Sequence, residues 1–273
     1  MSWHGQINRT IWEIQEQIKS KPENTRFRRE LLRAHFLQHF EFDRAFHVPR
    51  DDRSFLFLHD DKSVPTCLLL HGAKGTPAEM RELGNFLYSK GYSVYCPRFS
   101  RTDTKGRMVS WESWVTQAEI ALSTVKTLDE DTFIVGLSLG GTIGMMLADL
   151  HGAHGLVLLA PALYPRKSLK SHFYSFVRVA TPTLFYRVAG WNGEVLKAMD
   201  HAKHSIKKIE SPVLALQATD DKRLSRRGLK FIRRHATSEK SQVKILPFGS
   251  HVLTRGEAKS EVFNRIHEFL KNV

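Results

Sequence analysis

Near the middle of the chain, a serine flanked by glycines lies between two apolar stretches. The run Thr132–Val135 predicts a strand, and it leads through Gly136-x-Ser138-x-Gly140 into residues 142–148, which predict a buried helix. In this strand–turn–helix context the motif indicates a nucleophile elbow, because the glycines permit a sharp turn that lifts the serine hydroxyl clear of the sheet edge. The alternative is a glycine-rich turn that binds phosphate or only packs, since the motif also occurs by chance.

A serine hydroxyl is unreactive at neutral pH, so this chemistry also needs a general base and an acid that orients the base. Where an elbow of this type is catalytic, the chain order is serine, acid, histidine, with each group on the loop after its own strand. Here the predicted strand 213–217 is followed by Asp220 and Asp221, and the last predicted strand is followed by His251. Order, loop position and residue type therefore agree for Ser138, an aspartate and a histidine.

The elements that must position these groups alternate between strands and helices from about residue 46 onward. Strands are predicted at 54–59, 66–70, 93–96, 132–135, 155–159, 213–217 and 242–246. Helices are predicted near 78–90, after Ser110 as a cap, after the elbow, and near 225–235 and 259–270. Because such alternation is typical of a mostly parallel, doubly wound sheet, we expect an α/β fold. The carboxyl ends of its strands would bring the three loops to one edge.

Two segments depart from this alternation. Residues 1–45 predict an N-terminal helical arm, in which Leu32, Phe36 and Phe40 recur at helical spacing among arginines. The arm could pack on its own catalytic domain, 46–273, on a second subunit or on a membrane surface. Residues 161–210 are rich in aromatic and basic side chains and predict a helical cap, or lid, inserted over the catalytic edge.

The composition is strongly basic, with 41 Lys and Arg against 28 Asp and Glu and a formal net charge of +13. Such a field attracts anionic lipid, nucleic acid or acidic partners and says nothing about the fold. Because no zinc-finger spacing and no basic reading helix is recognisable, we expect no nucleic-acid partner. A solvated basic surface is the first interpretation, and peripheral contact with an anionic membrane is the second.

The cysteine content and the apolar runs bear on the compartment. Cys67 and Cys96 both lie in predicted strands, which is typical of buried thiols in a reduced intracellular protein. No apolar run approaches the roughly 20 residues that span a bilayer, and the first residues lack the apolar region of a secretory signal. These features predict a cytoplasmic protein. No set of metal-ligating residues stands out, so neither a metal nor an organic cofactor is expected.

The chain resembles the bacterial carboxylesterase and monoacylglycerol lipase branch of the α/β-hydrolases. Four motifs carry the resemblance: LLLHG at 68–72, GLSLGG at 136–141, QATDD at 217–221 and SHV at 250–252. Together they cover roughly residues 54–270 and leave 1–45 outside. One departure is residues 100–103, SRTD, where that family usually has a Gly-His-Gly turn, so the substrate class does not carry over.

The resemblance implies a role for each site residue. Ser138 would be the nucleophile, His251 the general base and then acid, and Asp221 the acid that orients it. Asp221 is favoured over Asp220 because family spacing places the acid four residues after the glutamine of the third motif. The oxyanion hole would be formed by the backbone N–H groups of Leu139, directly after the nucleophile, and of Ala73 on the first glycine-rich loop. His71 would brace that loop without acting as the base.

The activity that follows is hydrolysis of a carboxylic ester through an acyl-enzyme on Ser138. Its substrate would be a small-molecule or lipid ester, and acylglycerols, thioesters and aryl esters are all compatible. A thioesterase or an acyltransferase on the same fold is one alternative, since both share the acyl-enzyme. The other is a non-catalytic member that uses the pocket to bind a ligand.

Overall fold

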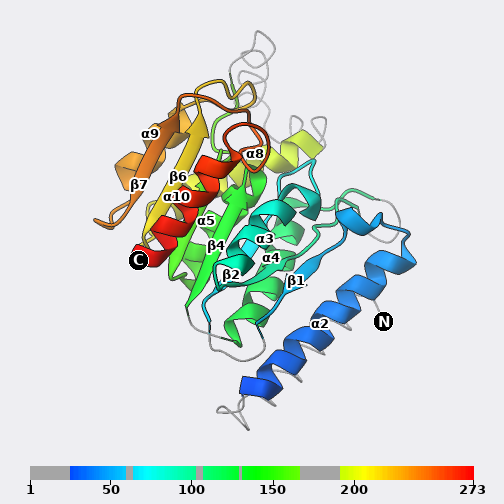
Figure 1. Cartoon of the computed structure of the whole chain (residues 1–273). Coiled ribbons are helices and arrows are strands. Elements are labelled where there is room, and N and C mark those ends of the chain that lie inside the picture. Colours follow the sequence, from blue (N-terminus) through cyan, green and yellow to red (C-terminus); the bar gives the residue numbers. More distant parts are fainter. Residues whose placement is uncertain (1–24, 60–63, 103–106, 129–130, 167–190) are drawn as a thin grey trace.

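Seven strands form one sheet in the order β1-β3-β2-β4-β5-β6-β7 (Figure 1). The computed structural model describes residues 25–59, 64–102, 107–128, 131–166 and 191–273. Within these residues β1 pairs antiparallel with β3, and every other neighbouring pair of strands is parallel. The strands are β1 (Phe55–Phe57), β2 (Thr66–Leu70), β3 (Ser93–Cys96), β4 (Thr132–Leu137), β5 (Gly155–Leu159), β6 (Val213–Ala218) and β7 (Gln242–Leu246). The predicted α/β fold with a mostly parallel sheet is confirmed.

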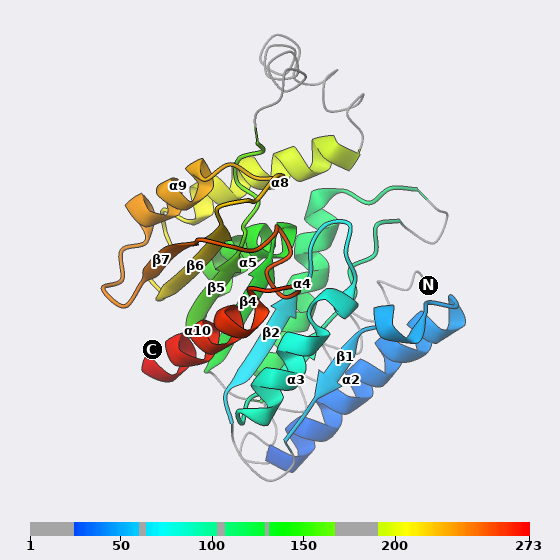
Figure 2. The ribbon, with the colours of Figure 1, turned by 45° about the horizontal axis from the view of Figure 1, so that its top comes forward.

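Helices cover both faces of the sheet (Figures 1 and 2). On β2, Leu68 and Leu70 belong to one buried cluster and Cys67 and Leu69 to the other, because successive side chains of a strand point to opposite faces. The first cluster contains buried residues of α4 (Trp111–Lys126), α5 (Leu139–His151), α8 (Trp191–Ser205) and α9 (Arg227–His235). The second contains those of α3 (Arg81–Ser89) and α10 (Lys259–Asn272). The inner strands β3, β2, β4, β5 and β6 are therefore buried on both faces, as the inside of a parallel sheet requires.

The arm helix α2 (Thr25–Ala45) lies along the β1 edge of the sheet (Figures 1 and 2). Its Leu32 is completely buried and belongs to the same cluster as the core side chains of α4. The ring of Phe36 meets the ring of Tyr95 on β3 edge-on, with centroids 6.3 Å apart. The described part of the arm therefore packs on its own chain. Residues 1–24 lie outside the described residues, and the division at residue 45 stays a prediction.

The predicted cap, 161–210, is described only in part, because residues 167–190 lie outside the described residues. Its C-terminal portion forms α8, which packs against α5 and α4. Ala198 and Ala202 of this helix have no exposed surface and join the apolar cluster on the α5 face of the sheet. α8 is therefore part of the core, and a cap over the site stays a prediction.

Three local predictions are corrected by the structure. The predicted helix 78–90 is divided into a 3₁₀ turn, η2 (Pro77–Glu79), and α3, which begins at Arg81. The predicted strand 54–59 is only three residues long, and a second 3₁₀ turn, η1 (Arg50–Asp52), precedes it. Ser110 makes no side-chain cap bond to α4. Instead, Glu194 of α8 accepts a hydrogen bond of 3.0 Å from the N–H of Trp111, the first residue of α4.

The two cysteines, Cys67 and Cys96, are buried free thiols, and burial raises the pKa of both above the ordinary thiol value. Both side chains belong to the cluster that α3 and α10 cover. Within the described ranges, no helix combines the length and the apolar character that crossing a bilayer requires.

Candidate active site

Ser138 stands at the turn between β4 and α5 with φ +56° and ψ −114°, a backbone conformation that side-chain-bearing residues rarely adopt. The two glycines make this turn possible. A Cβ on Gly136 would lie 2.4 Å from the backbone of Gly140, and a Cβ on Gly140 would lie 2.0 Å from the carbonyl oxygen of Leu70. A side chain at Gly136 would therefore push α5 away from β4, and one at Gly140 would push α5 away from the end of β2.

The structure brings Ser138, His251 and Asp221 into one hydrogen-bonded row. His251 Nε2 lies 3.0 Å from Ser138 Oγ, and His251 Nδ1 lies 3.0 Å from Asp221 Oδ2. Since the aspartate only accepts when ionised, the histidine proton lies on Nδ1, and Nε2 is free to accept from the serine hydroxyl. The imidazole is 8% exposed and the aspartate 2% exposed, so both work largely out of water.

The Asp221 carboxylate is held by four hydrogen bonds. Oδ1 accepts from the N–H groups of Arg223 (2.8 Å) and Leu224 (3.1 Å), and Oδ2 accepts from Gln217 Nε2 (3.1 Å) as well as from His251. Burial raises the pKa of this carboxyl, but the hydrogen bond and charge of His251, with the two backbone N–H groups, outweigh burial and leave the pKa below its ordinary value. The ionised form is therefore favoured.

The two adjacent aspartates have different environments. Asp221 faces the histidine, whereas Asp220 is exposed. Gln217, which sequence reasoning recognised only as a motif residue, has a definite place here. Its Nε2 also donates to the carbonyl of Leu224, at 3.2 Å, and so fixes the loop that carries the acid. A lone glutamine in the otherwise apolar run 213–218 was the signal for this role.

The first glycine-rich loop runs beside the serine. A Cβ on Gly72 would lie 3.5 Å from Ser138 Cβ, so the loop backbone passes in contact with the nucleophile. Leu139 is the first residue of α5, and its N–H therefore has no partner within the helix. This arrangement is compatible with an oxyanion hole formed by the N–H groups of Leu139 and Ala73, which stays a prediction.

His71 links this loop to the loop after β3. Its Nδ1 lies 2.9 Å from the carbonyl of Gly72, and its Nε2 lies 3.0 Å from the N–H of Phe99. The pattern fits a neutral imidazole that donates from Nδ1 and accepts at Nε2. Burial lowers its pKa from 6.5 to about 4, with smaller contributions from the charges of Arg98 and Arg101, so the ring is neutral at pH 7. His71 is held in place and does not contact the serine–histidine pair.

A buried polar cluster behind Phe99 was not predicted from the sequence. Arg98 Nε donates to Asp43 Oδ1 at 2.6 Å, and Asp43 Oδ2 accepts from the N–H (3.0 Å) and hydroxyl (3.3 Å) of Ser54. The Arg98 N–H in turn donates to Ser54 Oγ at 2.9 Å. Asp43 is 3% exposed, which is unusual for an acid on a helical arm.

Across the described residues, no group of three or more His, Cys, Asp or Glu side chains is arranged to hold a metal ion.

Known proteins resemble this chain in sequence. Residues 61–189 match the family model described as serine aminopeptidase, S33 (Hydrolase_4), a range that includes Ser138 but ends before Asp221 and His251. A carboxylesterase of Bacillus subtilis is 23% identical over 81% of this chain and 97% of its own length. A thermostable monoacylglycerol lipase of Bacillus sp. is 34% identical over 31% of this chain and 35% of its own length.

Solved structures agree on the fold. One, reported in a study of LipS and LipT, two metagenome-derived lipolytic enzymes, superposes with a TM-score of 0.71 at 19% identity, covering 83% of this chain and all of the other. A monoacylglycerol lipase of Paleococcus ferrophilus superposes with a TM-score of 0.63 at 20% identity, covering 80% and 97% of the two chains. The chain has the α/β-hydrolase fold, and its sequence is similar to those of a carboxylesterase and a monoacylglycerol lipase.

Proposed function

We propose that this ester hydrolase acts through a covalent acyl-enzyme on Ser138, with His251 as general base and then acid and Asp221 as the residue that orients it. The observation that carries the proposal is the pair of 3.0 Å contacts that His251 makes, one from each ring nitrogen. They give the histidine one basic nitrogen directed at the serine hydroxyl, which nucleophilic catalysis by serine requires.

The first half-reaction forms the acyl-enzyme. Ser138 Oγ attacks the ester carbonyl carbon while its proton moves to His251 Nε2. The carbonyl oxygen gains the electron pair, and we assign its stabilisation to the N–H groups of Leu139 and Ala73. When the carbon–oxygen bond to the leaving alcohol breaks, His251 returns the proton to that alcohol. Asp221, kept ionised by its hydrogen bonds, stabilises the imidazolium that exists between these two transfers.

The second half-reaction releases the acid. Water takes the place of the alcohol, gives its proton to His251 and attacks the acyl carbon. Collapse of the second tetrahedral species returns the proton to Ser138 and frees the carboxylic acid. Each proton that the histidine accepts is given back within the same half-reaction, so no cofactor is consumed.

A fluorophosphonate probe tests the nucleophile directly, since only an activated serine displaces its fluoride. The wild-type protein and Ser89→Ala, which changes an exposed serine of α3, should label and should hydrolyse p-nitrophenyl esters alike. Ser138→Ala should do neither while unfolding at the wild-type temperature. Ester turnover that survives in Ser138→Ala would refute the acyl-enzyme, and a wild-type protein that never labels would favour the non-catalytic alternative.

The acceptor and the leaving group are separate questions. Added glycerol would compete with water for the acyl-enzyme, so the ratio of transfer product to free acid separates an acyltransferase from a hydrolase. Matched ester, thioester and aminoacyl amide substrates would rank the leaving groups, the amide being included because the matched family is described as an aminopeptidase. We propose that esters rank first, as the names of the carboxylesterase and lipase relatives suggest.

A further inference from the structure

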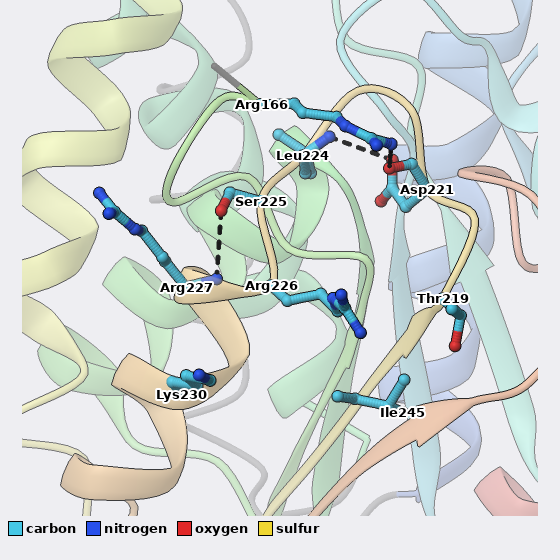
Figure 3. Close-up of a pocket in the computed structure, with 9 residues that line it drawn as sticks. All are labelled: Arg166, Thr219, Asp221, Leu224, Ser225, Arg226, Arg227, Lys230 and Ile245. Atoms are coloured by element: carbon cyan, nitrogen blue, oxygen red, sulfur yellow. Dashed lines mark hydrogen bonds between the residues drawn. The ribbon is translucent and has the colours of Figure 1, made fainter.

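A concave site lies beside the loop that carries Asp221. It is a pocket of about 410 Å³ between the start of α9, the end of β6 and β7 (Figure 3). Ser138 and His251 are not among its lining residues, so it is separate from the proposed catalytic serine. The lining includes four cationic side chains, those of Arg166, Arg226, Arg227 and Lys230.

Within the described part of the chain, none of these four cations forms an ion pair with a carboxylate. The acidic residue of the lining is Asp221, whose two oxygens are occupied by His251, Gln217 and two backbone N–H groups. Arg166 is held in position instead by the backbone, since its Nη1 donates to the carbonyl of Asp221 at 3.0 Å. The pocket is therefore a concave surface with a net positive charge that no carboxylate of the described residues compensates.

The other lining groups of the pocket, the start of α9 and two apolar side chains, indicate which kind of anion would fit. α9, a helix of nine residues, begins at Arg227, and its first turn adds the positive end of the helix dipole. The lining also includes two apolar side chains, Leu224, which lies beside Arg166, and Ile245, which lies at the other end of the pocket, past Arg226 (Figure 3). Ile245 is 41% exposed although it is large and apolar. The cations favour an anion, and Ile245 provides an apolar surface for a small organic group beside it.

We propose that this pocket binds a phosphate monoester, with its phosphate at Arg226 and Lys230, which lie one helical turn apart at the start of α9, and its organic group against Ile245. Arginine suits this role because its planar group donates to two phosphate oxygens at once. The phosphate monoester could be a soluble metabolite or the headgroup of a lipid.

The binding test uses the full-length Ser138→Ala protein, so that ester turnover plays no part in the readout. Isothermal titration in a phosphate-free buffer of low ionic strength should show saturable, one-site binding of phenyl phosphate. Inorganic phosphate should bind more weakly because it lacks the apolar group, and benzyl alcohol should not bind. Vesicles of phosphatidic acid, whose headgroup is a phosphate monoester, form a separate arm against vesicles of neutral phosphatidylcholine.

Matched variants separate the pocket from the basic surface. Arg226→Ala combined with Lys230→Ala removes two lining cations, and Arg234→Ala combined with Lys244→Ala removes two exposed cations outside the lining. The first pair should weaken phenyl phosphate binding by about tenfold or more, and the second by less than about twofold. If the first pair does not fold, judged by circular dichroism, Arg226→Gln alone should still weaken binding several-fold.

The outcomes divide clearly. Equal weakening by both pairs, or no saturable binding in either arm, would overturn the proposal and leave a solvated basic surface. Binding of phosphatidic acid vesicles alone, lost in the pocket pair, would support the pocket and identify a lipid headgroup as its source. None of these results depends on whether Ser138 forms an acyl-enzyme.

Discussion

Arg98 and Asp43 form a buried ion pair, at 2.6 Å, that joins the arm helix α2 to the loop after β3. The next residue in that loop, Phe99, gives its N–H to His71, and His71 in turn contacts the carbonyl of Gly72. A continuous set of polar contacts thus connects the arm to the glycine-rich loop beside the serine. Because each member is partly or fully buried, the contacts hold their positions without competition from water.

Asp43→Asn tests how much this pair stabilises the fold. The change removes the charge but keeps a hydrogen-bonding group, so we expect the free energy of unfolding to fall by about 1–3 kcal/mol. Urea unfolding followed by circular dichroism measures it. The control is Glu41→Gln, which breaks the exposed pair of Glu41 with Arg44 and should cost less than about 0.5 kcal/mol. An equal loss of unfolding free energy in the two variants would show that the Asp43–Arg98 pair stabilises the fold no more than an exposed pair does.

Asp221→Asn should lower kcat by about 10⁴, because an amide at this position favours the histidine tautomer that cannot accept from the serine. KM for a p-nitrophenyl ester should change little, since the substrate does not contact the acid. Asp220→Asn is the matched control, and its exposed side chain predicts a change of less than about threefold. A larger loss from Asp220→Asn than from Asp221→Asn would refute the assignment.

Gly140→Ala should destabilise the protein by about 3 kcal/mol or more, because the new Cβ would lie 2.0 Å from the Leu70 carbonyl oxygen and force the backbone apart. Gly228→Ala in α9 is the control, where the nearest heavy atom would be the Leu163 Cβ at 3.5 Å, an ordinary contact. There the better helix propensity of alanine should leave stability unchanged or raise it by up to about 1 kcal/mol. Thermal and urea unfolding compare the two. Equal stability of both variants would mean that the elbow tolerates a side chain.

His71 makes stability depend on pH in a defined direction. Its pKa is about 4 in the folded protein and 6.5 otherwise, so between these values the unfolded chain binds a proton that the folded one does not. The contribution of His71 to the free energy of unfolding should therefore be fully present above pH 6.5. It should be lost as the pH falls toward 4, which lowers the free energy of unfolding by up to about 3 kcal/mol. Urea unfolding of wild type and His71→Asn gives the slope due to this group.

Nuclear magnetic resonance gives an independent check on the intact protein. The imidazole signal of His71, assigned by its loss in His71→Asn, should stay at the neutral position down to about pH 5. A signal that titrates between pH 7 and 6 would contradict a buried, neutral ring. Only wild type is titrated, so the variant has to be folded at neutral pH alone, where the signal is assigned.

The sequence by itself determined the elements whose signals are local. Apolar runs and glycines located most strands and helices to within a few residues, and Gly91, with φ +94°, follows the end of α3. The elbow was also readable, since strand, glycines, serine and helix are contiguous. The meeting of the three candidate loops at one edge of the sheet followed from the alternation of strands and helices, because parallel strands have their carboxyl ends at the same edge.

The tertiary structure decided what depends on residues far apart in the chain. Glu194 rather than Ser110 satisfies the first N–H of α4, across 83 positions, and Arg98 reaches Asp43 across 55. The antiparallel direction of β1 and the convergence of Arg166 with the start of α9 are of the same kind. Such contacts leave no periodic trace in the sequence, because a single buried charge or cap looks like any other polar residue until packing removes the water around it.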